Sequence, residues 1–187
     1  MLARLDRRLL RLARTRGHSP GVEAAMKAVG AAGEWGAVWF AIGLVGAAAD
    51  RARRERWGRA ALVGPGAVGV NYVAKVIVRR PRPRLRRLPP LAGAPSNLSF
   101  PSAHATSSLA AATAFGRVEP RTRLPLYGLA AAICATRPYL GMHYPSDVLA
   151  GAGLGIAIGA LVPGVGERSL EERLIDLIAR DSEGEPR

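Results

Sequence analysis

Two of the three histidines in this chain lie in short polar segments between long apolar stretches. His104 follows Pro101 and Ser102 at the start of one apolar stretch, and His143 stands four residues before Asp147 between two others. An imidazole titrates near neutral pH and can act as a nucleophile or as a proton donor and acceptor, and a neighbouring carboxylate can orient its ring. These residues are therefore candidates for acid–base and nucleophilic chemistry.

Three basic residues accompany the histidines in the same polar segments. Lys75 lies near the end of an apolar stretch, Arg82 lies in the loop after it, and Arg137 lies near the end of a later stretch. Each of them alone has an ordinary explanation as an anchor at the membrane interface or as a loop charge. Because ammonium and guanidinium groups also hold phosphate oxygens, the set together indicates a site for an anionic group.

Five apolar stretches must position these residues. A membrane-spanning helix needs about 20 apolar residues, and shorter stretches can rely on their neighbours. The second stretch ends, the third begins and the loop between the fourth and fifth returns on the same side, so the three polar segments can meet there. We therefore expect an all-α, polytopic membrane helix bundle of about five to six transmembrane helices. The stretches are residues 28–49, 58–78, 101–116, 121–138 and 147–163.

Charge and hydropathy are segregated along the chain. Hydrophobic residues make up 49% of the sequence and charged residues 22%, and the charges form short clusters between the apolar stretches. This pattern is typical of a multi-pass membrane protein, which we expect in the cell (inner) membrane. The formal net charge of +13 suits an anionic membrane surface, so we expect membrane lipids and not nucleic acid as partners. Cys134 is the only cysteine, which excludes a disulfide within one chain.

Three regions follow from this pattern. The first is a basic N-terminal segment whose leucines at positions 2, 5, 9 and 12 fall on one helical face, as expected of a helix that lies on a membrane surface. The second is the transmembrane domain, and the third is an acidic tail in which residues 169–180 have the pattern of a short helix. Their ranges are 1–19, 20–163 and 164–187.

Glu34 interrupts the first apolar stretch. Residues 20–33 are therefore expected to form a separate short or re-entrant helix, and whether it crosses the membrane decides which side holds the polar segments. The arginines are divided too evenly between the two sides to settle this orientation. In the last stretch, Gly151, Gly155 and Gly159 form two successive GxxxG steps, which allow close helix packing in lipid.

The polar segments together resemble the three-part signature of the type 2 phosphatidic acid phosphatase superfamily. That signature reads K-x6-RP, PSxH and (S/T)R-x5-H-x3-D, and the chain matches it in order from Lys75 to Asp147. Ala103 replaces the commonest glycine and Thr136 replaces the commonest serine. If a helix has begun by Ala103, its right-handed conformation suits alanine, so we expect activity to be retained.

The resemblance implies a role for each matching residue. His143 is the nucleophile that forms a phosphohistidine, Asp147 orients its ring, and His104 protonates the leaving oxygen and then activates water. Lys75, Arg82, Ser102 and Arg137 hold the phosphate, together with backbone N–H groups at the start of the helix near Pro101. No cofactor or metal is expected, because Asp147 is the only acidic residue in the three segments.

A lipid phosphate is the expected substrate, because the predicted site lies at the ends of membrane helices. The stretches SNLSFPSAHATSS and GMHYPSDVLAG are similar to those of small bacterial family members, including actinobacterial decaprenylphosphoryl-phosphoribose phosphatases. That similarity implies a phosphomonoester or diphosphate of a polyprenyl-linked cell-envelope precursor. Undecaprenyl diphosphate, phosphatidate and phosphatidylglycerophosphate remain alternative substrates.

Two other classes of protein compete with this interpretation. A basic, non-enzymatic protein that binds membranes or nucleic acid accounts for the charge but leaves the spacing of the histidines unexplained. A vanadate-binding haloperoxidase relative shares the signature, but those enzymes are soluble and the long apolar stretches argue against it.

Overall fold

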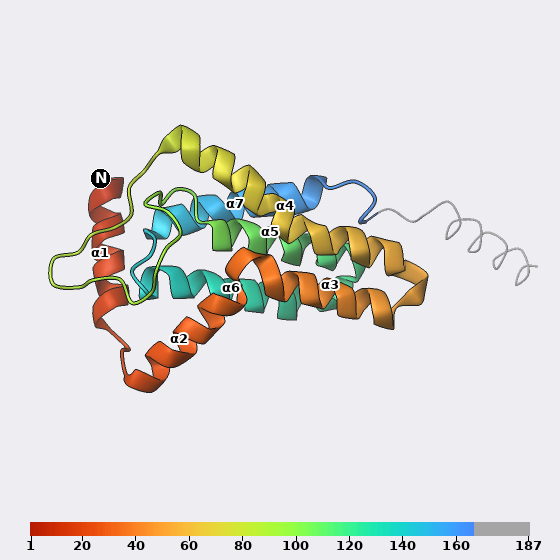
Figure 1. Cartoon of the computed structure of the whole chain (residues 1–187), viewed down its shortest axis with the longest axis horizontal. Helices are drawn as coiled ribbons and strands as arrows, with labels where there is room; N and C mark the ends of the chain where they lie inside the picture. Colours follow the sequence, from red (N-terminus) through yellow and green to blue (C-terminus); the bar gives the residue numbers. More distant parts are fainter. Residues whose placement is uncertain (167–187) are drawn as a thin grey trace, which may run out of the picture.

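The computed structural model describes residues 1–166, and in that range the chain is all-helical. Most of the helices run along one long axis, while the first lies across one end of the bundle (Figure 1). The seven α-helices of this range are α1 (Leu2–Thr15), α2 (Pro20–Ala32), α3 (Ala37–Ala49), α4 (Arg54–Val78), α5 (Ala103–Val118), α6 (Arg123–Tyr139) and α7 (Pro145–Leu161).

The apolar stretches of the sequence correspond closely to helices. The stretches at 58–78, 101–116, 121–138 and 147–163 become α4 to α7 with ends shifted by a few residues. Proline and polar residues set several of these ends: Ser102 is the N-cap of α5, and Pro145 opens α7. The predicted helix over 169–180 lies outside the described residues.

The first apolar stretch is broken, as Glu34 predicted. Residues 20–32 form α2 as a separate helix, and a short 3₁₀ turn over Glu34–Gly36 joins it to α3 with a bend of 48°. Trp35 and Gly36 in this turn have φ of 53° and 75°. Gly36 tolerates this left-handed backbone at little cost, whereas Trp35 adopts it with some strain.

By length and composition, one helical stretch in the described range can cross a membrane alone. This is Arg51–Val78, which contains α4, and the bent pair of α2 and α3 passes the same test when it is counted as one span. Helix α7 is apolar but shorter. The expected number of five to six membrane helices therefore stays a prediction.

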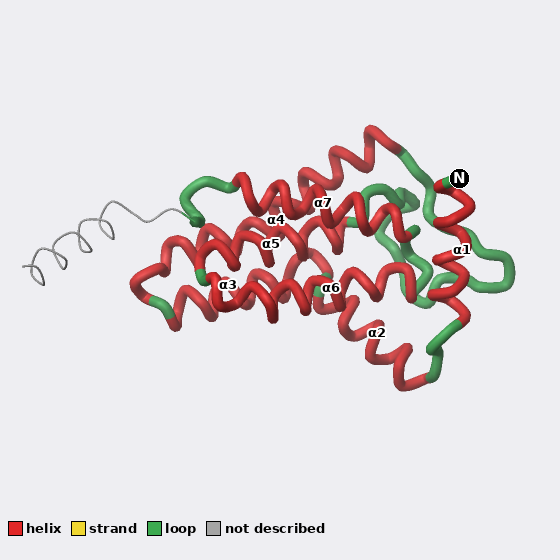
Figure 2. The backbone as a smooth tube through the Cα atoms, turned by 180° about the vertical axis from the view of Figure 1, so that it is seen from behind, coloured by secondary structure: helices red, strands yellow, loops and turns green. Residues whose placement is uncertain are grey.

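Helix α5 lies at the centre of the bundle, with α4, α6 and α7 packed around it (Figures 1 and 2). Its side chains are mostly small and buried, which allows these helices to approach closely. The two GxxxG steps of α7 face α5: a methyl group added at Gly155 or Gly159 would collide with a backbone carbonyl of α5, and one added at Gly151 with the carbonyl of its N-cap, Ser102. These glycines therefore serve helix packing within the chain.

Helix α1 is amphipathic in two ways. The predicted row of leucines is exposed on its outer side: Leu2, Leu5, Leu9 and Leu12 are each more than two-fifths accessible. A second row, Asp6, Leu10 and Arg14, is buried against the bundle. The outer face is exposed, and the inner face ties α1 to the end of the bundle where the predicted site lies.

Candidate active site

The predicted site residues come from four helices and two loops that converge at one end of the bundle. Lys75 lies in the last turn of α4, His104 in the first turn of α5 and Arg137 in the last turn of α6. Arg82 lies in the loop after α4 and His143 in the connection from α6 to α7. All five line one cavity of about 770 Å³. The convergence expected from the order of the apolar stretches is thus present in the structure.

The remaining two predicted residues lie behind the cavity wall. Ser102 and Asp147 are fully buried, and the Ser102 backbone N–H donates to the Asp147 carbonyl over 3.0 Å. The Ser102 hydroxyl has no hydrogen-bond partner among residues 1–166. It can therefore donate a hydrogen bond to a ligand at the start of α5.

The neighbours of His143 define which ring nitrogen carries its proton. Nδ1 lies 2.8 Å from the Ser99 carbonyl, which can only accept, and Nε2 lies 3.1 Å from the Arg82 guanidinium, which can only donate. The neutral ring therefore has its hydrogen on Nδ1 and its lone pair on Nε2. A lone pair beside a cation at the cavity wall is the arrangement that a nucleophile for a bound anion requires.

The environment of His143 also keeps it neutral. The residue is 2% exposed. Burial lowers the pKa of His143 to about 4, Arg82 and other nearby cations act in the same direction, and the Asp147 carboxylate opposes them. The imidazole is therefore unprotonated at neutral pH, as a nucleophile must be.

Asp147 acts on His143 less directly than the sequence suggested. Its Oδ2 lies 3.8 Å from His143 Nδ1, which is beyond hydrogen-bond distance. It accepts instead from the Ser99 hydroxyl, from the Tyr144 backbone N–H over 2.9 Å and from Arg80 over 2.7 Å. Because the Ser99 carbonyl takes the Nδ1 hydrogen, Asp147 holds the residue that orients the histidine.

The three predicted phosphate-binding cations differ in how much of their hydrogen-bonding capacity is used. Lys75 Nζ donates to the carbonyls of Pro101, Leu98 and Ser99 over 2.8, 3.2 and 3.4 Å. Lys75 thus holds the loop before α5 in place and adds its charge to the cavity from there.

The two arginines are more available to a ligand. Arg82 donates to the carbonyls of Ser96 and Met142 over 2.7 and 2.8 Å, and its position beside His143 aims its charge at the nucleophile. Arg137 is 6% exposed, and its Nε has no hydrogen-bond partner in the described part of the chain. A buried guanidinium that lacks a partner lowers its free energy by binding an anion.

His104 faces the break between α2 and α3. Its Nε2 lies 3.1 Å from the Gly30 carbonyl near the end of α2. Asn71 lines the same cavity and donates to Thr106 Oγ1 over 2.9 Å, which joins α4 to α5. In residues 1–166 no three His, Cys, Asp or Glu side chains come close enough together to hold a metal ion.

Sequence reasoning missed three residues of this arrangement. Ser99 contributes a backbone carbonyl, which leaves no mark on the sequence. Arg80 is one of many arginines in the segment RRPRPRLRR. Asp6 accepts from Arg80 over 2.8 Å, and it did have a signal, because it is the one acidic residue of the otherwise basic N-terminal helix.

The fold and the site define a helical bundle with a cationic, histidine-containing cavity at one end. The chain belongs to the PAP2 superfamily, whose family model matches residues 59–169. It is 41% identical to decaprenylphosphoryl-5-phosphoribose phosphatase of Mycobacterium tuberculosis over 151 residues, which are 79% of this chain and 82% of that protein.

Two solved structures share the fold. One is the transmembrane PAP2 type phosphatidylglycerolphosphate phosphatase from Bacillus subtilis, with a TM-score of 0.67, 24% identity and coverage of 87% of this chain and 85% of that one. The other is LpxE from Aquifex aeolicus, with a TM-score of 0.68, 23% identity and coverage of 84% and 93%. The prediction of an all-helical PAP2 fold is confirmed.

Proposed function

We propose that this protein is a multi-pass inner-membrane phosphatase that releases phosphate from a polyprenyl-linked cell-envelope precursor. The observation that carries the proposal is the neutral His143, whose Nε2 lone pair lies beside Arg82 at the wall of a cavity that Arg137 also lines, with a guanidinium Nε that has no hydrogen-bond partner within residues 1–166. Membership of the PAP2 superfamily and the named Mycobacterium tuberculosis relative support the reaction and the class of substrate.

The reaction proceeds in two steps. In the first, the phosphate is held by Arg82 and Arg137, His143 Nε2 attacks phosphorus, and the bond from phosphorus to the leaving oxygen breaks. His104 gives its proton to that oxygen. In the second step, His104 removes a proton from water, the water oxygen attacks phosphorus, and the P–N bond breaks to release phosphate and restore Nε2. The Ser99 carbonyl stabilises the Nδ1 hydrogen throughout.

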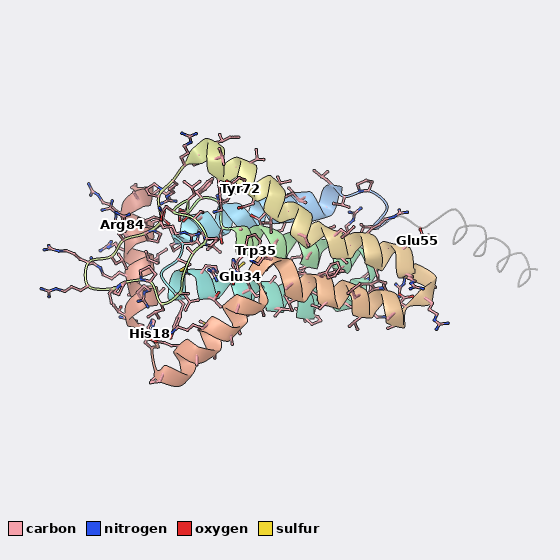
Figure 3. All side chains as sticks on the ribbon, viewed as in Figure 1. His18, Glu34, Trp35, Glu55, Tyr72 and Arg84 are labelled. Atoms are coloured by element: carbon pink, nitrogen blue, oxygen red, sulfur yellow. The ribbon has the colours of Figure 1, made fainter. Side chains whose placement is uncertain are left out.

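One side of the cavity is lined by exposed aromatic residues that suit a lipid chain. Trp35 and Tyr72 line it beside Glu34, and both aromatic side chains are more than three-fifths exposed (Figure 3). They stand at the bend between α2 and α3 and on the facing side of α4. Exposed aromatic and aliphatic side chains there suit an acyl or prenyl chain that approaches from the bilayer, and residues 20–163 form the membrane domain.

The proposal is tested by measuring phosphate release from purified full-length protein in detergent. The panel contains a polyprenylphosphoryl-5-phosphoribose, undecaprenyl diphosphate, phosphatidate and phosphatidylglycerophosphate. We expect the first to give the highest kcat/KM. His143→Ala should abolish release, while His18→Ala should retain it because His18 stacks on Tyr139 away from the cavity. A higher kcat/KM for phosphatidate or another member would reassign the substrate, and no release from any member would refute the proposal.

A further inference from the structure

The buried face of α1 carries a single acidic residue, Asp6. This carboxylate is 3% exposed, whereas its neighbours Arg4, Arg7 and Arg8 in the helix are exposed to solvent. Its Oδ2 accepts from Arg80 Nη2 over 2.8 Å and from the Ser146 hydroxyl over 2.5 Å, and its Oδ1 accepts from the Ser146 backbone N–H over 3.0 Å. Asp6 therefore binds two segments that are more than 70 residues away in the chain.

Arg80 joins Asp6 to the catalytic end of α7. While Nη2 binds Asp6, Nη1 donates to Asp147 Oδ1 over 2.7 Å and to the Ser146 hydroxyl over 2.8 Å. The guanidinium also lies 4.3 Å above the Tyr144 ring. A planar guanidinium held by a carboxylate on each side has little freedom to rotate.

The contacts continue from Asp147 to the nucleophile. Asp147 holds the Ser99 hydroxyl, and the Ser99 carbonyl takes the Nδ1 hydrogen of His143 over 2.8 Å. Each of these groups is nearly or fully inaccessible to solvent, so the hydrogen bonds are stronger than they would be in water. A continuous series of polar contacts thus runs from α1 to the attacking ring.

We propose that Asp6 is a positioning residue for the phosphatase reaction, acting on His143 through Arg80 and Asp147. The inference rests on the proposed function, because it concerns the same nucleophile. Loss of the Asp6 charge leaves Arg80 bound to one carboxylate, so that Arg80 can turn and draw Asp147 away from Ser99. The expected defect lies in the alignment of the ring and not in substrate binding.

The experiment compares Asp6→Asn with a control on the same face of α1. Arg14 is also buried, but within residues 1–166 it donates only to the backbone carbonyls of Tyr139 and Pro89, over 3.3 and 2.7 Å. Asp6→Asn should lower kcat about tenfold and leave KM within about twofold, since the defect concerns the transition state. Asp6→Glu, which keeps the charge, should recover part of the loss.

A double-mutant cycle with Asp147→Asn distinguishes positioning from simple docking of α1. Once Asp147 is neutral, Asp6→Asn should lower kcat further by at most about twofold, because the contacts that link Asp6 to His143 through Asp147 are already broken. Arg14→Gln should lower activity by the same factor in both backgrounds. If Asp6→Asn prevents folding, Arg80→Lys provides the same test, because lysine cannot hold both carboxylates.

Several outcomes would overturn the inference. An unchanged kcat for Asp6→Asn and Arg80→Lys would do so, as would a loss confined to KM or an equal loss with and without Asp147→Asn. These results leave wild-type phosphatase activity intact and so leave the proposed function standing. A wild-type protein that releases no phosphate from any lipid would instead refute the proposed function and the inference with it.

Discussion

Replacing Arg137 with lysine separates the charge of this residue from its geometry. The side chain is 6% exposed, and its Nε lacks a hydrogen-bond partner within residues 1–166. It packs against Gly30, where an added Cβ would stand 3.1 Å from Nη1. A lysine keeps the positive charge, but its ammonium group cannot bind two phosphate oxygens with two parallel N–H groups.

The size of the effect follows from the lost hydrogen bond. A hydrogen bond to a charged group contributes about 1.5 to 3 kcal/mol. A lysine that keeps one contact with the phosphate and loses the other raises the barrier by that amount. Because each 1.36 kcal/mol corresponds to about a tenfold change in rate, kcat/KM should fall about 10- to 150-fold. Most of the loss should appear in kcat, since charge redistributes over the phosphate oxygens in the transition state.

The assay is the initial rate of phosphate release from the preferred lipid phosphate in detergent. Arg84→Lys is the matched control, because Arg84 is exposed in the loop after α4 (Figure 3) and does not line the cavity that holds His143 and Arg137. Its kcat/KM should stay within about twofold of wild type. Near-normal turnover by Arg137→Lys would show that Arg137 serves as an interfacial anchor and would refute its role in binding phosphate.

Four further predictions concern metal, the histidines, pH and packing. Phosphate release should persist in excess EDTA, because the cations of the chain hold the phosphate; a loss that Mg²⁺ restores would contradict this. His143→Ala should trap no labelled phosphoenzyme after acid quench, whereas His104→Ala should be severely impaired with a lipid alcohol and less so with a nitrophenyl leaving group, which departs without a proton; label on His143→Ala or equal defects would reverse the roles. Since folding lowers the pKa of His143 from 6.5 to about 4, the unfolded chain alone binds that proton between these values, and the melting temperature should fall as pH drops through this window; His143→Ala should reduce that slope, and an unchanged slope would contradict it. Gly155→Ala should lower the melting temperature because its methyl group would collide with the Thr106 carbonyl, while Gly153→Ala, which meets no atom within 4 Å, should not; equal melting temperatures would refute the packing argument.

The arrangement of the site was predictable because it depends on helix order. Lys75 ends one apolar stretch, His104 begins the next, and His143 lies in the loop that returns to the same side. Alternating helices bring such segments together whatever the details of their packing. The separate helix before Glu34 was also readable, since a carboxylate interrupts an otherwise apolar run.

The hydrogen bonds within the site were not predictable from residue types. Arg80 and Arg82 are separated by one proline in an irregular loop, and no periodicity tells which of them faces Asp147 and which faces His143. The partner of His143 Nδ1 is a backbone carbonyl, which every residue possesses. Lys75 matched the expected position, but its ammonium group binds loop carbonyls that the sequence could not reveal.

The distribution of these partners bears on how the site receives an anion. Lys75, Arg82 and Arg137 surround one cavity, and like charges in a poorly solvated space repel one another. Backbone carbonyls offset this repulsion for Lys75 and for part of Arg82, but nothing in the described chain satisfies Arg137 Nε. A phosphate that binds there relieves the repulsion and supplies the missing acceptor. The bound phosphate also brings phosphorus next to Arg82. Arg82 then donates to the phosphate oxygens in place of His143 Nε2, and this exchange frees the Nε2 lone pair for attack.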